Sequence, residues 1–183
     1  MIEAWRKVSS RPLGDFRVFS VRQERKVSPR TGAEHEFFII DSANWVNVIA
    51  LTVDARVVLV EQFRHGSETV ELEIPGGVMD AGDASPEATG CRELLEETGY
   101  EGEQPQIIGQ VLPNPAIMTN VCSTVFLSNC RHVKPVHFDN AEDIVTKLVP
   151  LAQVPELVAS GQIRHALMVA ALYQFDLWWK KQP

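Results

Sequence analysis

Apolar and polar positions alternate along the first third of the chain in short runs that are typical of β-strands. The runs "DFRVFSVRQERKV" (15–27) and "EHEFFII" (34–40) are rich in Val, Ile and Phe. Between them lies "SPRTG" (28–32), whose Pro and Gly favour a turn. The pattern therefore predicts an antiparallel hairpin near the N-terminus.

Three further runs predict buried or half-buried strands. "NWVNVIALTV" (44–53) and "RVVLVEQFR" (56–64) are almost continuously apolar, as expected of strands covered on both faces. "TVELEIP" (69–75) alternates apolar residues with Glu71 and Glu73 and ends at Pro75. We expect Val70, Leu72 and Ile74 to occupy the buried face of this half-buried strand.

Helical periodicity starts later in the chain. Residues 86–98 predict a helix because Ser85 is a good N-cap, Pro86 suits the first helical position, and Gly99 suits the C-terminal end. Strands are then expected in the stretches 106–112, 122–130 and 142–151, and helices in the stretches 154–161 and 164–181. Strands grouped before helices predict an α+β domain with a mixed sheet. We expect residues 1–45 to form an N-terminal β extension and residues 46–183 to form the main domain.

Composition and charge narrow the possible partners. The chain has 183 residues, a formal net charge of -7 and no run of Lys or Arg, which argues against binding a nucleic-acid backbone. No stretch supplies the ~20 apolar residues of a membrane span, and the N-terminus does not resemble a signal peptide. The 3 Cys show neither a CxxC pair nor zinc-finger spacing. We therefore expect a cytoplasmic protein that contacts neither nucleic acid nor membrane.

The segment "IPGGVMDAGDASPEATGCRELLEETGY" (74–100) carries the densest group of acids. On a helix, Glu93, Glu96 and Glu97 share one face, and Arg92 reaches Glu96 at i+4. This face could simply be solvated. However, like charges at this spacing repel, and a hard divalent cation would reverse the sign of that energy, so the cluster also suits Mg²⁺.

The glycine pair ahead of this helix has two interpretations. Gly76 and Gly77 could let backbone carbonyls approach a metal or ligand closely, because neither has a side chain. Either glycine could instead be needed for a tight turn with a positive φ angle. The sequence leaves both interpretations open.

The same segment resembles the signature box of the Nudix hydrolases, which ends in R-E-U-x-E-E-x-G-U, where U is bulky and apolar. The positions that match this second half are Arg92, Glu93, Leu94, Glu96, Glu97, Gly99 and Tyr100. The first half departs from the pattern in two ways. Asp83 replaces the usual Glu, and eight residues rather than seven separate this acid from Arg92. The resemblance implies an α-β-α sandwich around a mixed sheet and metal-dependent hydrolysis of a nucleoside diphosphate linked to another moiety, X.

The resemblance also implies roles for single residues. Glu93 and Glu97 would be ligands of Mg²⁺, with Mn²⁺ as a second candidate metal. Glu96 would be a further ligand or a contact through water, and the carbonyl of Gly76 could complete the coordination sphere. Arg92 would orient the carboxylates, and Glu96 and Glu97 would take part in catalysis.

The run "VEQFRHGSETVELEIPGG" (60–77) resembles the approach to the box in pyrophosphatases that act on ADP-ribose and nucleoside-diphosphate sugars. By this likeness Arg64 would contact the substrate phosphates and Glu73 would lie beside the metals. The alternatives are an ordinary surface arginine at a strand end and a glutamate that faces solvent.

That subfamily has an N-terminal antiparallel extension that exchanges across a homodimer and offers aromatic groups to the base. By resemblance we expect a homodimer, with Phe37 and Phe38 as substrate-binding residues and Trp45 as a further candidate. Packing in the core is the alternative role for each of these side chains.

A catalytic acid is expected well after the box, where "HFDNAEDIVTKLVPL" (137–151) resembles the matching loop. Glu142 would be the general base or an extra metal ligand, with Asp139 and Asp143 as nearby substitutes. A loop with three acids could also be merely solvated.

The resulting hypothesis is Mg²⁺-dependent hydrolysis of a nucleoside-diphosphate sugar, with ADP-ribose giving AMP and ribose 5-phosphate. Two alternatives remain open: removal of pyrophosphate from nucleoside triphosphates, and a Nudix-fold sensor that binds a nucleotide sugar without cleaving it. The complete R-E-x-x-E-E core favours an enzyme over a sensor.

Overall fold

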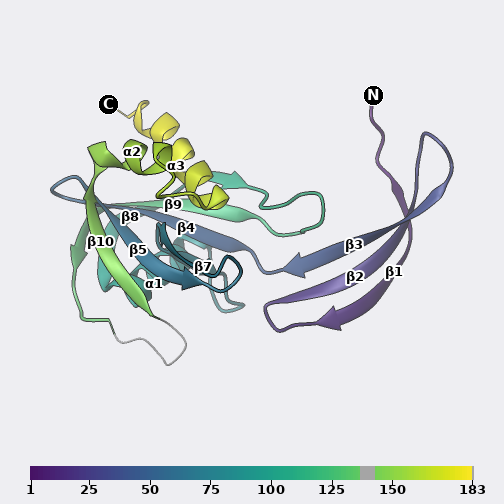
Figure 1. Cartoon of the computed structure of the whole chain (residues 1–183), viewed down its shortest axis with the longest axis horizontal. Helices are drawn as coiled ribbons and strands as arrows, with labels where there is room; N and C mark the ends of the chain where they lie inside the picture. The colour runs from purple at the N-terminus through teal and green to yellow at the C-terminus, as the bar shows by residue number, and fades with distance from the viewer. Residues whose placement is uncertain (137–142, 183) are drawn as a thin grey trace. The chain divides into compact units, whose positions relative to one another are not determined.

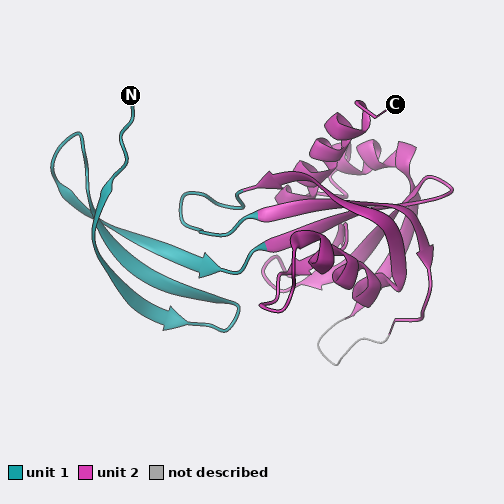
Figure 2. Cartoon of the chain, turned by 180° about the vertical axis from the view of Figure 1, so that it is seen from behind, with its two compact units in different colours: residues 1–44, 112–121 teal, residues 45–111, 122–183 magenta. Residues whose placement is uncertain are grey.

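The computed structural model describes residues 1–136 and 143–182. The chain divides into two compact units, which Figure 2 shows in different colours. The first unit is Met1–Asn44 together with Leu112–Val121, and the second is Trp45–Val111 together with Cys122–Pro183.

The first unit is built on an antiparallel sheet in the order β1-β2-β3. Its strands are β1 (Arg6–Asp15), β2 (Phe19–Val27) and β3 (Glu34–Ser42). The predicted hairpin is confirmed as β2 and β3, with Gly32 at a φ of 72° in the turn. Strand β1 was not expected, because its polar and almost wholly exposed sequence carries no alternating pattern.

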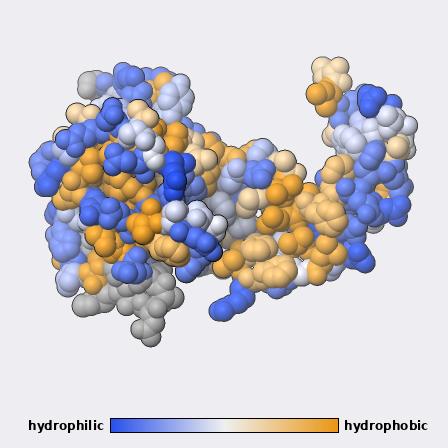
Figure 3. Space-filling model, viewed as in Figure 1, coloured by the Kyte–Doolittle hydropathy of each residue, from blue (hydrophilic) through white to orange (hydrophobic). Residues whose placement is uncertain are grey.

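A segment distant in sequence completes this unit. Residues 112–121 lie against β3, where the Ile40 N–H donates to the Ile117 carbonyl at 2.8 Å and the Thr119 N–H donates to the Ile40 carbonyl at 3.2 Å. Apolar side chains remain exposed on the unit, among them Leu13, Phe16 and Phe38, and Figure 3 shows hydrophobic surface over the N-terminal strands.

The second unit contains a mixed sheet in the order β10-β5-β4-β9-β8, with β6 added to β5 and β7 added to β4. Its strands are β4 (Trp45–Thr52), β5 (Arg56–Arg64), β6 (Thr69–Glu73), β7 (Gly76–Val78), β8 (Tyr100–Val111), β9 (Cys122–His132) and β10 (Ile144–Pro150). Only the β4–β9 pair is parallel among the described strands. The predicted α+β class with a mixed sheet is thereby confirmed.

Helices cover both faces of this sheet (Figure 1). They are α1 (Pro86–Thr98), the 3-10 turn η1 (Leu151–Gln153), α2 (Val154–Ala159) and α3 (Ala166–Trp179). Successive side chains of β4 point to opposite faces, so Val48 packs in the cluster with Leu94 of α1, whereas Ile49 packs in the cluster with Phe175 of α3. The result is the expected α-β-α sandwich.

The ends of α1 match the chemistry of its sequence. The Ser85 hydroxyl accepts a hydrogen bond from the Ala88 N–H, and Pro86 occupies the first turn. Gly99 adopts a left-handed conformation with a φ of 71° and donates its N–H to the Leu95 carbonyl. Both predicted boundaries are confirmed because each depends on local backbone chemistry.

Trp178, near the C-terminus, packs against the core around α3, whereas Trp179 is 41% exposed. The ring of Trp178 lies 4.8 Å from that of Phe126, and Phe126 stacks on Phe175 at 5.8 Å. Among the described residues, no helix is both long and apolar enough to cross a membrane.

In the first unit, Glu24 is buried and surrounded by basic groups. Its carboxylate pairs with Lys7 at 3.2 Å, Arg22 at 2.9 Å and Lys26 at 3.0 Å. The hydrogen bonds from Lys26 and Arg22 hold the pKa of Glu24 at about 2.

This arrangement predicts a defined loss of stability in acid. A pKa that is lower in the folded state than the ordinary ~4.3 gives stability above that value, which is lost as the pH falls toward 2. Glu24→Gln should lower the unfolding free energy at pH ~6 and flatten its decline below pH ~4.3, as followed by urea unfolding at several pH values. Glu36→Gln, at an exposed position of β3, is the matched control. An unchanged acid decline in Glu24→Gln would contradict the prediction.

Candidate functional site

Strand β7 presses closely on helix α1 at the predicted glycine pair. The Gly76 N–H donates to Glu97 Oε2 at 3.0 Å. A Cβ on Gly76 would clash with the Val46 carbonyl, and a Cβ on Gly77 would clash with the Glu93 carboxylate. Neither glycine is among the residues with positive φ, so the turn interpretation is wrong. Both glycines are needed because backbone, helix and carboxylates meet here.

Arg92 organises the loop that leads into α1. Its Nη2 donates to Asp83 Oδ2 at 2.9 Å and to the Val78 carbonyl at 3.2 Å, and its Nη1 lies 2.9 Å from both Glu93 and Glu96. The hydrogen bond from Arg92 is the main reason that the pKa of Asp83 lies well below its ordinary range. Asp83 thus stabilises the loop geometry, although the box usually has a longer acid there.

The carboxylates beside the glycines suit a hard divalent cation. The Glu93 side chain is 14% exposed and Glu97 is 9% exposed, whereas the Glu96 side chain is 56% exposed and pairs with Arg92. The two nearly buried carboxylates supply oxygen donors, which Mg²⁺ prefers. In the described part of the chain, no three Asp, Glu, His or Cys side chains already form a metal-sized cluster.

Most of the acids of the predicted catalytic loop lie outside the described residues. Glu142 and Asp139 fall within residues 137–142, which the structure does not describe. Asp143 is described and exposed. The role of Glu142 therefore stays a prediction.

Arg64 and Glu73, which the sequence singled out, form one ion pair. Arg64 donates from Nε at 3.0 Å and from Nη2 at 2.7 Å to the two oxygens of Glu73. His165 Nδ1 lies 3.2 Å from the same carboxylate. Burial opposes ionisation, but His165 and Arg64 outweigh it and lower the pKa of Glu73 to about 2. The alternative in which Glu73 faces solvent is wrong, because Glu73 is 0% exposed.

A second arginine–glutamate pair, which was not expected, involves Glu71, two residues earlier on β6. Arg164 donates from Nε to Glu71 Oε2 at 3.0 Å and from Nη2 to Glu71 Oε1 at 2.6 Å. This hydrogen bonding, supported by Thr69, lowers the pKa of Glu71 to about 2. Contrary to expectation, both glutamates are buried and Val70 is 64% exposed, whereas Leu72 and Ile74 pack in the core as expected. Arginines brought from other elements make that burial favourable.

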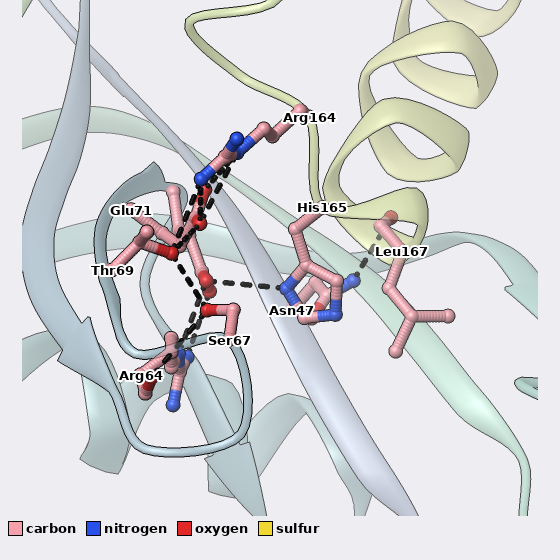
Figure 4. Close-up of polar contacts among 9 residues, drawn as sticks. Asn47, Arg64, Ser67, Thr69, Glu71, Arg164, His165 and Leu167 are labelled. Atoms are coloured by element: carbon pink, nitrogen blue, oxygen red, sulfur yellow. Dashed lines mark hydrogen bonds and ion pairs between the residues drawn. The ribbon is translucent and has the colours of Figure 1, made fainter.

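These groups line one cleft of about 860 Å³ in the second unit. Gly76, Gly77 and Val78 border it, as do both arginines and His165. Trp45 and Leu167 supply apolar surface, and the Asn47 side chain donates to the Leu167 carbonyl at 3.3 Å. Figure 4 shows Arg164 and Arg64 at the two ends of a column of polar residues that includes Ser67, Thr69 and Glu71.

The structure separates the three aromatic candidates. Phe37 and Phe38 belong to the first unit and, as neighbours on β3, point to opposite faces of its sheet. Phe37 packs edge-on against Trp5 at 5.4 Å, whereas Phe38 is 56% exposed. Trp45 begins β4 and lines the cleft.

The contact between Gly77 and Glu93 predicts a selective loss of metal binding. Gly77→Ala would push the Glu93 carboxylate aside, so we expect the affinity for Mg²⁺ to fall roughly tenfold or more, as measured by isothermal titration calorimetry. Gly82→Ala is the control, because no atom lies within 4 Å of the Cβ position at Gly82. Equal affinities in the two variants would contradict the prediction.

Comparison with known proteins agrees with this geometry. The NUDIX domain family matches residues 43–172. An ADP-ribose pyrophosphatase of Bacillus subtilis (strain 168) is 30% identical over 141 residues, which are 76% of this chain and 75% of the relative. An ADP-sugar pyrophosphatase of Mus musculus is 41% identical over 137 residues, or 66% of this chain and 58% of the relative.

The fold is shared beyond sequence similarity. A crystal structure of an ADP compounds hydrolase superposes with a TM-score of 0.85 at 20% identity and covers 98% of this chain and 96% of that chain. At such low identity the superposition speaks for the fold alone. The match of the family to residues 43–172 and the similarity to the bacterial pyrophosphatase establish that the chain belongs to the Nudix family and is a Nudix hydrolase.

Proposed function

We propose that this Nudix hydrolase cleaves the pyrophosphate bond of a nucleoside-diphosphate sugar, with ADP-ribose giving AMP and ribose 5-phosphate in the presence of Mg²⁺. The observation that carries the proposal is the placement of Glu93 and Glu97 against Gly76 and Gly77, beside a cleft that also presents Arg64. The similarity to an ADP-ribose pyrophosphatase of Bacillus subtilis and an ADP-sugar pyrophosphatase of Mus musculus supports it.

A pyrophosphate repels a hydroxide nucleophile because both are anionic. Bound divalent cations would neutralise the phosphate oxygens and make the attacking water more acidic. Glu93 and Glu97 would hold these cations, with the Gly76 carbonyl as an additional donor. Arg92 keeps the Glu93 and Glu96 carboxylates in place, and Glu96 would contribute directly or through water.

The remaining chemistry would be shared among groups of the cleft and the later loop. Arg64, held by both oxygens of Glu73, presents a fixed guanidinium to the phosphates, and five donors in a planar fork suit that task. Glu142 would accept the proton of the attacking water or bind a further cation. Trp45 would stack on the base at the edge of the cleft.

We infer that the protein acts as a homodimer. The exposed apolar side chains of the first unit support this inference, because large exposed apolar patches mark interaction surfaces. Within such a dimer, Phe38 is better exposed than Phe37 to serve as a second aromatic contact for substrate. All 3 Cys are free thiols, which fits a reducing compartment such as the cytoplasm.

A substrate panel tests the proposed function. ADP-ribose, other nucleotide sugars, dinucleotides and nucleoside triphosphates would be incubated with Mg²⁺, with Mn²⁺ and with EDTA, and the products separated by ion-exchange chromatography. We expect AMP and ribose 5-phosphate from ADP-ribose and none with EDTA. Preferred cleavage of triphosphates would reject the substrate assignment, and tight binding without cleavage would identify a sensor.

Replacing the metal-binding carboxylate tests the role of α1. Glu97→Gln removes a charge without changing the shape, so we expect turnover of ADP-ribose to fall by at least roughly 100-fold, because metal charge stabilisation is worth several kcal/mol. Glu156→Gln on exposed α2 is the matched control. Thermal unfolding would verify the fold of both variants, and an unchanged rate in Glu97→Gln would contradict the proposed metal-binding role of Glu97.

A further inference from the structure

Arg164 is a cation of the cleft that the proposed chemistry does not use. It precedes α3 and borders the cleft, and its side chain stays 57% exposed although its partner Glu71 is almost buried. Its Nε and Nη2 groups donate to Glu71, and Nη2 also donates to Thr69 Oγ1 at 3.1 Å. A guanidinium has five N–H donors. The two on Nη1 therefore have no partner among the described residues.

The buried carboxylate beneath Arg164 holds it in place. Two hydrogen bonds to one carboxylate fix the plane of the guanidinium, so an incoming anion would not have to order a flexible side chain. The low pKa of Glu71, about 2, keeps this pairing intact at neutral pH. Glu71 neutralises the positive charge of Arg164 but leaves the two N–H donors of Nη1 available to an incoming anion.

The position of Arg164 along the cleft distinguishes it from Arg64. Glu71 and Glu73 are two residues apart on β6, so their side chains leave the strand about 7 Å apart on the same face. The two arginines lie at opposite ends of the column of polar residues in Figure 4, so an anion bound by Arg164 would be distinct from the phosphates bound by Arg64.

These observations bear on the X moiety of the substrate, and the inference rests on the proposed function. If the base stacks on Trp45 and the phosphates contact Arg64, Arg164 is the arginine of the described cleft lining that remains available to the X moiety. We propose that Arg164 is a specificity-determining residue that binds an anionic group, a phosphate or a carboxylate, carried by the X moiety. The preferred substrates would then be nucleoside diphosphates linked to a phosphorylated or carboxylated sugar.

A pair of matched substrates tests this inference. ADP-ribose would be compared with the same molecule phosphorylated at the anomeric hydroxyl of the distal ribose, and kcat/KM would be measured for each. We expect wild type to prefer the phosphorylated molecule and Arg164→Gln to lower that preference roughly tenfold, the usual effect of one charge-assisted hydrogen bond. UDP-glucose and UDP-glucuronate form a second pair that distinguishes a carboxylate from a phosphate.

Two further variants separate recognition from folding. Arg164→Gln combined with Glu71→Gln avoids leaving a buried charge unpaired, and it should lose the preference to the same extent. Arg131→Gln breaks an exposed ion pair with Glu101 away from the cleft and should keep the preference. A preference that is the same in wild type and in both Arg164 variants, for both substrate pairs, overturns the inference.

Binding gives a readout that does not depend on turnover. Dissociation constants for both members of each pair would be measured by calorimetry with Ca²⁺ in place of Mg²⁺. If wild type cleaves no substrate, the proposed function fails, but an Arg164-dependent difference in affinity within a pair still supports the anion site. Equal affinities within both pairs would overturn the anion site even if ADP-ribose is cleaved.

Discussion

The close approach of strand β7 to helix α1 is the constraint on which both the fold and the site depend. Two residues without side chains let the Gly76 N–H reach Glu97 and let the Glu93 carboxylate lie directly on Gly77. Because the helix is also anchored by buried Leu94, the carboxylates cannot move away from the strand without disturbing the core. A repulsive acidic face is thereby held where cations and a pyrophosphate would make it favourable.

Three arginines pair with the acidic side chains in and around the site. Arg92 ties the loop before α1 to the helix through Asp83, so the shorter acid and the longer spacer of this box still give an ordered turn. Arg64 and Arg164 each bind a buried glutamate of β6 through both oxygens of its carboxylate. In each pair the glutamate is buried and the arginine remains partly exposed, so the surface of the cleft presents donors rather than acceptors.

Local signals in the sequence predicted an element correctly where its structure depends on residues close together in the chain. The cap at Ser85, the left-handed Gly99 and the apolar runs of β4 and β5 gave correct elements. The alternation in β6 gave a correct strand and correctly placed Leu72 against the core. It did not reveal that the two glutamates are also buried, because their arginine partners come from outside the strand. Strand β1 carried no signal, since it is stabilised by pairing with β2 and not by burying a face of its own.

The sequence by itself determined the family, the order of most elements and the acids of α1, because periodicity, capping and the R-E-x-x-E-E spacing are properties of consecutive residues. Only the tertiary structure decided that the glycine pair serves close contact rather than a turn, and that Phe37 and Phe38 lie on opposite faces of one sheet. It also joined Arg164 to Glu71 across 93 positions of the chain. A buried carboxylate requires a charged or hydrogen-bonding partner. That partner can come from any element that packs alongside in the fold, so it cannot be predicted from the residues next to the carboxylate in the sequence.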